Sequence, residues 1–214
     1  MSKSRARPAS DAVVTHETRE RILAGASQAF GKLGYASTRV EDVIAAAGVS
    51  RPTFYKAFES KGDVFEELSA RHHRDIRERI MRSLDGVADP AAQLDSIVDA
   101  YMRWRAELGP VGRILDEEAR LPGTRLGKHR RETLDAMSAW SSERLRAAGR
   151  READPLLYQA LIAAMESVGD RLLSKHPVPP AAIARAKRIA LRIIAGALAA
   201  EGEAVPPIPA APRE

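Results

Sequence analysis

The strongest constraint on the fold is a helical pattern of apolar residues that glycine and proline interrupt again and again. In the first segment, Ile22, Ala26 and Phe30 follow one another at four-residue intervals and so share one helix face. Alternating runs rich in Val, Ile and Thr, which would indicate strands, are absent from the sequence. We therefore predict an all-α protein of about nine helices. The expected helices span residues 17–33, 38–47, 51–57, 60–84, 90–108, 111–121, 125–148, 155–175 and 181–201.

Four residues near the N-terminus predict where the early helices begin and end. Thr38, with Glu41 three positions later, has the capping-box pattern, so the second helix is expected to open at Thr38. Gly48 is expected to end that helix in the left-handed conformation. Ser50 and Ser60 are expected to cap the third and fourth helices. The order helix, helix, tight glycine turn, short helix indicates a helix-turn-helix, although an ordinary helix pair fits the same pattern.

The short third segment has the size of a helix that enters the major groove of DNA. Phe54 and Phe58 are four residues apart and are expected to form its buried side. The rest of the segment is polar and is expected to offer hydrogen-bonding groups to bases or phosphates. These polar positions are Arg51, Thr53, Tyr55 and Lys56.

The charge balance of the chain is basic, with 34 Lys and Arg against 29 Asp and Glu and a net charge of +5. Most of the excess lies in residues 1–61, which hold ten of the basic and six of the acidic residues. A basic N-terminal region favours a nucleic-acid partner. An ordinary basic protein would explain the overall charge equally well.

Several classes of function are disfavoured by what the sequence lacks. With no cysteine, there can be no disulfide, thiolate nucleophile, zinc finger or iron–sulfur site. No HExxH, GxSxG, GxGxxG or P-loop pattern occurs, so we expect no enzyme activity, no metal and no cofactor. The histidines, including His72, and the acidic run 116–118 are expected on solvated helix faces. No apolar run is long enough for a membrane helix, and no signal peptide is evident, so a cytoplasmic protein is expected.

A set of residues in one register then identifies a family. The set comprises Thr18 to Leu23, Phe30, Gly34-Tyr35, Thr38, Ala47 to Ser50, Thr53 to Tyr55, Phe58 and Ser60-Lys61. This pattern resembles the DNA-binding domain of the TetR family of transcriptional repressors over roughly residues 17–65. Two positions depart from the family pattern: Pro52, where many members have Gly, and Ala57, where an aromatic residue or His is common. Ala57 cannot donate a hydrogen bond, so base reading must rest on its neighbours.

The resemblance, weighed with the chemistry of the side chains, implies DNA-binding roles. Arg51 is the main candidate for reading guanine, with a phosphate contact as its alternative. Tyr55 and Lys61 are expected to contact phosphate, and Arg39 phosphate or base. Lys3, Arg5 and Arg7 form a basic arm that either enters a minor groove or is simply solvated. The full expected DNA-binding set is Arg39, Ser50, Arg51, Pro52, Thr53, Tyr55, Lys56 and Lys61.

For the C-terminal helices, the resemblance implies an effector pocket and a dimer interface. The expected pocket residues are Tyr101, Trp104, Glu118, Met137, Trp140 and Met165, with Glu166 as a further polar lining residue. Ordinary core packing is the alternative for each of them. The expected interface residues, on two apolar helices, are Leu157, Leu161, Met165, Ile189, Ile193 and Ala197. Burial within one subunit is the alternative for these.

The sequence thus predicts four regions: a flexible basic arm over 1–16, a helix-turn-helix domain over 17–64, a helical effector-binding and dimerisation domain over 65–204, and a flexible Pro-rich tail over 205–214. The predicted function is that of a homodimeric, sequence-specific regulator of transcription that binds double-stranded DNA. In the main hypothesis it is a repressor that a small apolar or amphipathic effector releases from a palindromic operator. The alternative is a DNA-binding or protein-interaction regulator without a small-molecule switch.

Overall fold

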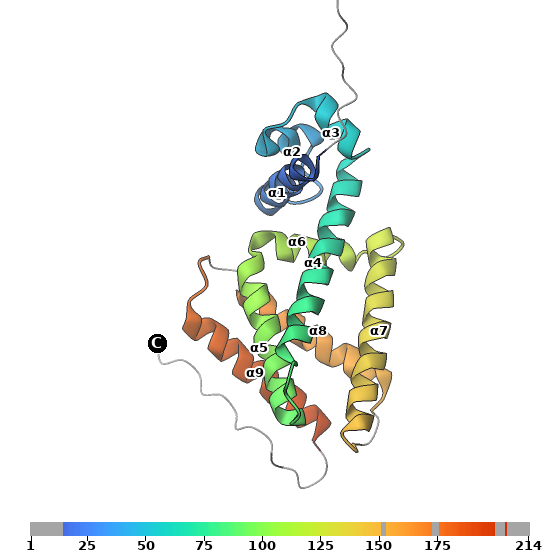
Figure 1. Ribbon diagram of the computed structural model, residues 1–214, viewed down its shortest axis with the longest axis vertical. Coiled ribbons are helices and arrows are strands. Elements are labelled where there is room, and N and C mark those ends of the chain that lie inside the picture. The colour runs from blue at the N-terminus through green and yellow to red at the C-terminus, as the bar shows by residue number, and fades with distance from the viewer. Residues whose placement is uncertain (1–14, 151–152, 173–175, 200–203, 205–214) are drawn as a thin grey trace, which may run out of the picture. The chain divides into compact units, whose positions relative to one another are not determined.

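The computed structural model describes residues 15–150, 153–172, 176–199 and 204. Over these residues the chain forms nine helices and no strand, which confirms the all-α prediction. The helices are α1 (His16–Leu33), α2 (Val40–Ala47), α3 (Arg51–Ala57), α4 (Lys61–Ser83), α5 (Pro90–Leu108), α6 (Pro110–Ala119), α7 (Arg125–Ala147), α8 (Pro155–Leu172) and α9 (Pro180–Leu198), as labelled in Figure 1. The tail over 205–214 and nearly all of the basic arm, including Lys3, Arg5 and Arg7, lie outside the described residues.

The chain divides into two compact units, Met1–Ser69 and Ala70–Glu214. The division falls within α4, so this helix starts in the N-terminal unit and ends in the C-terminal unit.

The N-terminal unit is built on an aromatic core and on one close helix crossing. Phe30 and Phe54 are fully buried, and the ring of Phe65 meets that of Phe30 edge-on at 5.1 Å. Helices α1 and α2 pack together at Gly25, where an added Cβ would lie 2.5 Å from the backbone nitrogen of Ala47. Glycine at position 25 is therefore what lets α2 approach α1 so closely.

The start of α2 differs from the prediction. Arg39, not Thr38, is the N-cap residue, and the carboxylate of Asp42 accepts the Arg39 backbone N–H at 2.7 Å. Thr38 is 1% exposed, and its hydroxyl donates to the carbonyl of Gly34 at 2.6 Å. The predicted capping box of Thr38 and Glu41 is therefore not formed: Thr38 is buried, and the helix starts one residue later with Arg39 and Asp42 in these roles. Ser60 behaves as predicted, because its hydroxyl accepts the backbone N–H of Asp63 at 3.2 Å.

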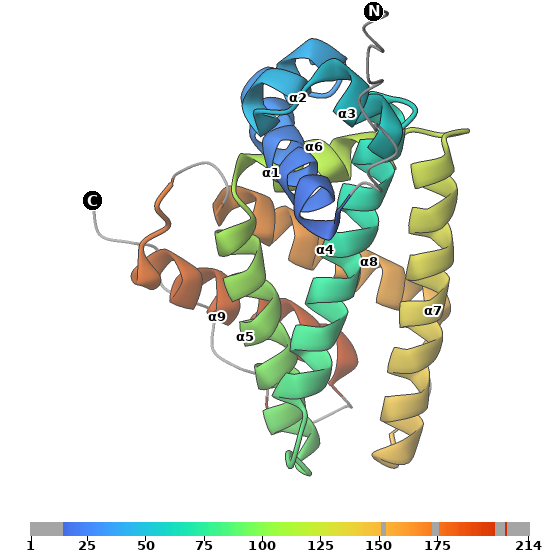
Figure 2. The same ribbon diagram turned by 45° about the horizontal axis from the view of Figure 1, so that its top comes forward.

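The core of the C-terminal unit lies where α5 packs against α8 and α9. Helix α7 packs on the other part of α8, and α6 packs on α7, as the two views in Figures 1 and 2 agree. The buried apolar members of this core are Val98, Tyr101, Met102, Trp104, Leu161, Met165, Leu172, Ala186, Ala190 and Ile194.

Candidate nucleic-acid interface and effector core

Helix α3 is short but well determined at both ends. The hydroxyl of Ser50 accepts the backbone N–H of Thr53 at 3.2 Å, which confirms Ser50 as the N-cap. Pro52 occupies the first turn, where its missing N–H costs no hydrogen bond. The turn before α3 is set by Gly48, which has a φ of 62° in the left-handed region, as the sequence predicted. A helix of seven residues is thus held in place by its caps and by one buried side.

The two sides of α3 differ sharply in burial. Phe54 is fully buried and Phe58, the C-cap residue, is 4% exposed, so the predicted apolar side is correct. Thr53 is half-buried, with its hydroxyl 2.7 Å from that of Ser50. The exposed positions of α3 and its N-cap are Ser50, Arg51, Pro52, Tyr55 and Lys56. Four of these five side chains carry polar groups, and the surface they share with Pro52 has the size that a major groove accepts.

Arg51 is held in place by two neighbours. Its Nη1 atom lies 2.5 Å from the Oε1 atom of Glu41 on α2, and its guanidinium lies 5.4 Å from the centre of the Tyr55 ring. The backbone N–H of Glu41 and the hydrogen bond from Arg51 lower the pKa of the Glu41 carboxyl, so the pair is ionised at neutral pH. Because both side chains are about 60% exposed, the pair is weak and can open toward a stronger acceptor.

A phosphate contact would require free N–H donors on Lys61, but the Lys61 ammonium group is already hydrogen-bonded within the fold. Its Nζ atom donates to the carbonyls of Tyr35 at 2.8 Å, Ala36 at 3.3 Å and Thr38 at 2.8 Å. An ammonium group has three N–H donors, and here all three are used. Lys61 therefore fastens the 35–38 segment to the start of α4.

Two arginines of α1 also serve the fold. Arg19 forms a forked ion pair with Glu67 and donates to the carbonyl of Ala57 at 2.9 Å. Arg21 donates to the carbonyls of Ala47 at 3.1 Å and Gly48 at 2.6 Å, which closes the end of α2. Some of the basic residues of the N-terminal region therefore bind backbone carbonyls at helix ends, and the others are left for an external partner. Arg39, by contrast, is exposed at the start of α2.

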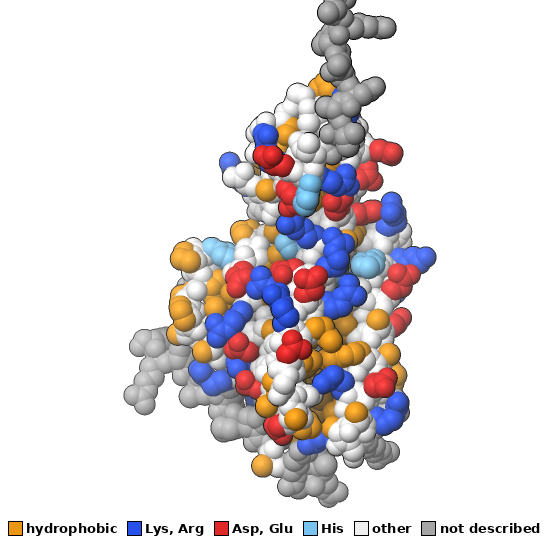
Figure 3. Space-filling view, viewed as in Figure 1, with side chains coloured by type: hydrophobic (Ala, Val, Ile, Leu, Met, Phe, Trp, Pro, Cys, Tyr) orange, Lys and Arg blue, Asp and Glu red, His pale blue; other side chains and the backbone are white. Residues whose placement is uncertain are grey.

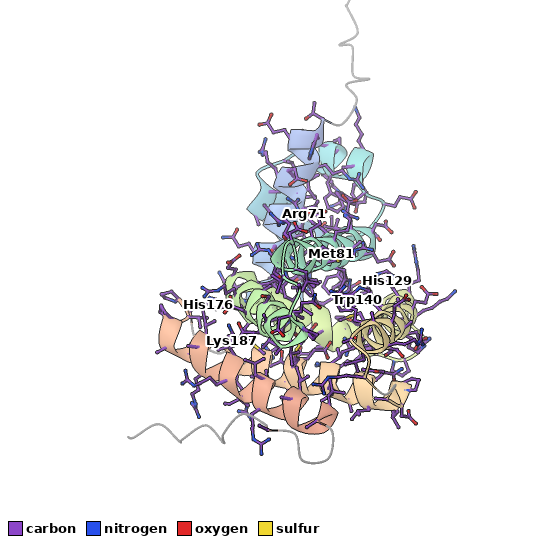
Figure 4. All side chains as sticks on the ribbon, turned by 60° about the horizontal axis from the view of Figure 1, so that its bottom comes forward. Arg71, Met81, His129, Trp140, His176 and Lys187 are labelled. Carbon is purple, nitrogen blue, oxygen red and sulfur yellow. The ribbon has the colours of Figure 1, made fainter. Side chains whose placement is uncertain are left out.

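The expected effector residues are only partly brought together. Tyr101 and Trp104 of α5 and Met165 of α8 belong to one buried cluster, with the rings of the first two 5.8 Å apart. Met137 and Trp140 are half-buried on α7 and lie outside that cluster. The guanidinium of Arg144 lies 5.1 Å from the centre of the Trp140 ring. Figure 4 labels Trp140 on α7. Glu118 is half-buried on α6.

An ion-pair network inside the C-terminal unit is the feature that sequence reasoning missed. Arg105 of α5 is 1% exposed, and its two terminal nitrogens lie 2.7 Å from Asp116 of α6 and 2.5 Å from Asp170 of α8. Arg130 of α7 binds both oxygens of Glu166, at 2.8 and 2.6 Å. A third arginine, Arg120, lies 3.3 Å from Glu166 and 3.9 Å from Asp170. Four helices thus converge on six charged side chains.

The acidic run 116–118 was expected to be an exposed face, and for Asp116 that expectation is wrong. Its side chain is only 18% exposed and forms an ion pair with the buried Arg105. Burial raises the pKa of the Asp116 carboxyl, and Arg105 opposes that rise. For Glu166, burial acts in the same direction, but the hydrogen bonds and charge of Arg130 outweigh it and lower the pKa. The one sequence signal for this network is the position of Arg105 among apolar residues of α5, where a charged residue needs a buried partner.

The expectation of solvated histidines is wrong for His72 and His73. Burial lowers the pKa of each imidazole to about 4, so both are neutral at pH 7. Among the described residues, neither Nε2 of His72 nor Nδ1 of His73 has a hydrogen-bond partner. The ring of His73 lies 5.5 Å from that of His129, and the charges of Arg130 and Glu166 also act on it.

The expected interface residues fall into two groups. Leu161 and Met165 are 9% and 8% exposed and belong to the core of a single chain. Leu157 and Ile189 are half-buried, whereas Ile193 is 38% exposed and Ala197 is exposed. Of the six expected interface residues, only Ile193 and Ala197, both on α9, are exposed.

A surface hollow on the C-terminal unit is lined by charges that largely neutralise one another. Arg79 lies 2.7 Å from Glu107, and Lys187 of α9 lies 2.7 Å from Asp95 and 3.1 Å from Asp99. Figure 3 shows basic and acidic side chains intermixed over this unit, and Figure 4 labels Lys187. The hollow is therefore a weaker candidate for ligand binding than the buried network.

The described part of the chain offers neither a metal site nor a membrane-spanning helix. No group of three or more His, Asp or Glu side chains there is placed to hold a metal ion. No helix there is both long enough and apolar enough to cross a membrane.

Comparison with known sequences places the N-terminal unit among regulators. Residues 22–68 match the family of bacterial regulatory proteins, tetR family. The chain is 34% identical over 61 residues to the uncharacterized HTH-type transcriptional regulator YdgC of Bacillus subtilis, a match that covers 28% of this chain and 31% of that protein. It is 28% identical over 85 residues to the HTH-type transcriptional activator FasR of Mycolicibacterium smegmatis, covering 40% and 39%. These matches span between three and four tenths of the relatives' lengths.

Comparison with solved structures extends the likeness to both units. A TetR-like transcriptional regulator from Rhodococcus sp. RHA1 superposes with a TM-score of 0.67 at 20% identity, covering 84% of this chain and 96% of that one. The fatty acid degradation regulator FadR from Bacillus halodurans gives a TM-score of 0.64 at 21% identity, covering 82% and 95%. At these identities the likeness concerns the fold, and the proteins compared are regulators rather than enzymes. Residues 22–68 thus match the tetR family of bacterial regulatory proteins, and the all-helical fold resembles that of a TetR-like transcriptional regulator.

Proposed function

We propose that the protein is a sequence-specific, homodimeric regulator of transcription that acts in the cytoplasm as a repressor. The observation that carries this proposal is α3, a helix capped by Ser50, anchored by buried Phe54 and exposing Arg51, Tyr55 and Lys56. Such a helix, following a left-handed glycine turn, is suited to the major groove of double-stranded DNA. The family match over residues 22–68 supports the same role.

In this proposal the DNA contacts are divided by chemistry. Arg51 leaves Glu41 and binds a guanine edge with two hydrogen bonds. Tyr55 and Lys56 contact phosphates, and Arg39 adds a phosphate or base contact at the start of α2. Ser50, Pro52 and Thr53 shape the helix start against the groove. Lys61 is reassigned from phosphate contact to support of the fold, because three carbonyls occupy its donors.

A second copy of the chain is needed because one short helix reads too few bases for useful specificity. Two copies related by a two-fold axis would read a palindrome whose half-sites lie ~34 Å apart or a multiple of that. The exposed apolar side chains of α9, Ile193 and Ala197, with half-buried Ile189, are the proposed contact. Ile193→Glu should give monomers in sedimentation while circular dichroism stays helical. A dimer that persists would place the interface elsewhere.

Release from DNA is assigned to an apolar or amphipathic effector bound in the C-terminal unit, at the core around Tyr101, Trp104 and Met165. The effector would favour a conformation in which the two copies of α3 no longer match the operator. One structural neighbour is a fatty acid degradation regulator, which suits an apolar effector. One relative is named an activator, so a reporter gene must establish the direction of regulation.

The deciding experiment is selection of bound fragments from genomic DNA, followed by affinity measurement on the selected palindrome and on random DNA. Arg51→Ala should weaken operator binding by about 1–3 kcal/mol and relax preference at one base position. Lys56→Ala should weaken both DNAs alike and lower the salt slope by about one. If no palindrome is enriched, the proposal fails. An operator that no small molecule ever releases would favour the alternative, a regulator without a switch.

A further inference from the structure

Arg19 of α1 contacts both the end of α3 and the first part of α4, all within the N-terminal unit (Figure 1). Its Nε and Nη2 atoms donate to the carboxylate of Glu67 on α4, with Nε 2.9 and 3.1 Å from the two oxygens. Its Nη1 atom donates to the carbonyl of Ala57 at 2.9 Å, and its guanidinium lies 4.2 Å from the centre of the Phe58 ring. Ala57 is the last residue of α3 and Phe58 is its C-cap, so one side chain joins the end of α3 to α4.

The two ends of α3 are held in different ways. At the start, Ser50 caps the helix and Gly48 makes the turn before it, so neighbouring residues fix this end. At the other end, Phe58 has an extended backbone, and the left-handed glycine that ends α2 has no counterpart. The last carbonyls of a helix have no partner within the helix, and an arginine can donate to them. The end of α3 therefore depends on Arg19, a residue of another helix.

The fork between Arg19 and Glu67 determines where the guanidinium points. Two N–H groups that meet one carboxylate fix the plane and the direction of an arginine. The two side chains are 41% and 29% exposed, so the pair is partly shielded from solvent. With one edge of the guanidinium on Glu67, Nη1 is directed at Ala57. A lysine at position 19 would keep the charge but not this orientation.

The end of α3 that Arg19 holds is also part of the surface proposed to face DNA. Tyr55 and Lys56 come directly before Ala57 and are exposed. Base reading by hydrogen bonds depends on distances and angles, whereas attraction to phosphates depends mainly on charge. A tilt of this short helix at Ala57 would move Arg51 as well. It would therefore weaken base reading more than general attraction to DNA.

We propose that Arg19 and Glu67 are positioning residues for sequence reading. Glu67 orients Arg19, and Arg19 holds the end of α3 in the position from which its polar side chains read one DNA sequence. The inference rests on the proposed function, because it concerns how α3 selects an operator. Neither residue is assigned a contact with DNA.

The test compares binding of the full-length protein to its genomically selected operator and to random DNA of the same length. Glu67→Gln keeps one side-chain oxygen but removes the charge and the fork, whereas Arg19→Lys keeps the charge but removes the planar geometry. Both variants should bind the operator about fivefold more weakly and random DNA within about twofold of the wild type. The ratio of operator affinity to random-DNA affinity should therefore fall. Partial unfolding weakens binding to both DNAs alike, so it leaves this ratio unchanged.

The sign of the effect separates positioning from charge. Glu67→Gln removes a negative charge, which by itself should strengthen binding to DNA. Glu59→Gln makes the same change in charge at an exposed residue just after α3 and is the matched control. We expect Glu59→Gln to keep the affinity ratio of the wild type. A ratio that falls only in Glu67→Gln then reports the lost hold on α3.

Amide hydrogen exchange without DNA tests this hold directly. The backbone N–H of Phe58 donates to the carbonyl of Phe54 at 2.9 Å, and that of Val49 donates to Ile44 at 3.3 Å. In both positioning variants, the Phe58 amide should exchange about fivefold faster relative to the Val49 amide. Val49 precedes the opposite end of α3 and serves as the internal reference, so a general loss of stability cancels.

The possible results separate this inference from the proposed function. If a palindrome is selected but the affinity ratio of Glu67→Gln or Arg19→Lys stays at or above the wild-type value, the inference is overturned and the regulator stands. Unchanged relative exchange of Phe58 in both variants has the same meaning. If the wild-type protein enriches no palindrome, the proposed function fails and the inference fails with it. Both readouts are ratios within one protein, so they remain decisive when a variant is less stable.

Discussion

The two units of this protein bury very different side chains. The N-terminal unit encloses Phe30, Phe54 and Phe65, and its Arg21 and Lys61 side chains donate to backbone carbonyls. The C-terminal unit joins six charged side chains in one network beside its apolar cluster, and of these only Arg120, the C-cap residue of α6, is exposed. The first core is satisfied by its own residues, whereas the second leaves Trp104 and Arg105 donors without acceptors among the described residues.

The difference in buried side chains affects how each unit is stabilised. Presenting α3 to DNA requires a fixed shape, and an aromatic core with capped helices supplies one. Buried ion pairs are poor sources of stability compared with apolar packing. Because removing one partner of a buried ion pair is strongly destabilising, the C-terminal unit depends more on single charged residues than the N-terminal unit does.

Arg105→Met should cause the largest loss, because it leaves Asp116 and Asp170 in the interior without their shared cation. We expect the C-terminal unit to lose about 3–5 kcal/mol of unfolding free energy. Urea denaturation followed by Trp104 fluorescence in a Trp140→Phe background measures it. Arg103→Met is the control, since Arg103 is on the same helix but its side chain is 63% exposed and pairs only with Asp99 in the contacts described. Equal losses in both variants would mean that the network is not special.

Lowering the pH should destabilise the C-terminal unit through His73. Burial lowers the pKa of His73 to about 4, whereas the unfolded chain keeps a value of ~6.5, so the unfolded state takes up the proton first as the pH falls. Stability is complete above about pH 6.5 and is lost toward pH 4, by up to roughly 3 kcal/mol for this imidazole.

Thermal denaturation from pH 7 to pH 4 measures the effect. His73→Phe should make the decline shallower without abolishing it, because His72 has the same lowered pKa of about 4. A decline of unchanged steepness in His73→Phe would show that His73 is solvated.

Lys61→Met tests whether Lys61 supports the fold or holds DNA. We expect a loss of about 1–2 kcal/mol in unfolding free energy, because the carbonyls of residues 35, 36 and 38 lose their donor. Binding to random DNA by the folded variant should keep the salt slope of the wild type. Lys32→Met, on exposed α1 surface, should leave stability unchanged. A salt slope lowered by about one with intact stability would restore the phosphate contact.

Glu41→Gln should have the smallest effect on stability, because the Glu41–Arg51 pair is solvated. Its thermal midpoint should stay within error of the wild type. Its affinity for random DNA should rise modestly at low salt, since Arg51 no longer has a competing carboxylate and one negative charge is gone. Unchanged affinity at every salt concentration would mean that Glu41 does not restrain Arg51.

The helices were predictable because their periodicity and punctuation are local properties. Gly48, Ser50 and Ser60 acted as expected, since a cap depends on neighbours within a few residues. The prediction that Thr38 caps α2 was wrong, because its buried hydroxyl donates to carbonyls of α1 and of the following turn. Roles that depend on distant partners were the least predictable.

The class of fold, the order of the helices and the short polar helix between Ser50 and Phe58 could all be predicted from the amino-acid sequence, because residue spacing and helix caps are local properties. Only the tertiary structure decided which charges are free for partners and which are used inside. The N–H groups of Lys61 donate to backbone carbonyls, and Arg105 is buried next to carboxylates from two other helices. Residues 105 and 170 are 65 positions apart, and no local pattern encodes such a meeting. It follows from the packing of α5 against α8, which the whole chain produces together.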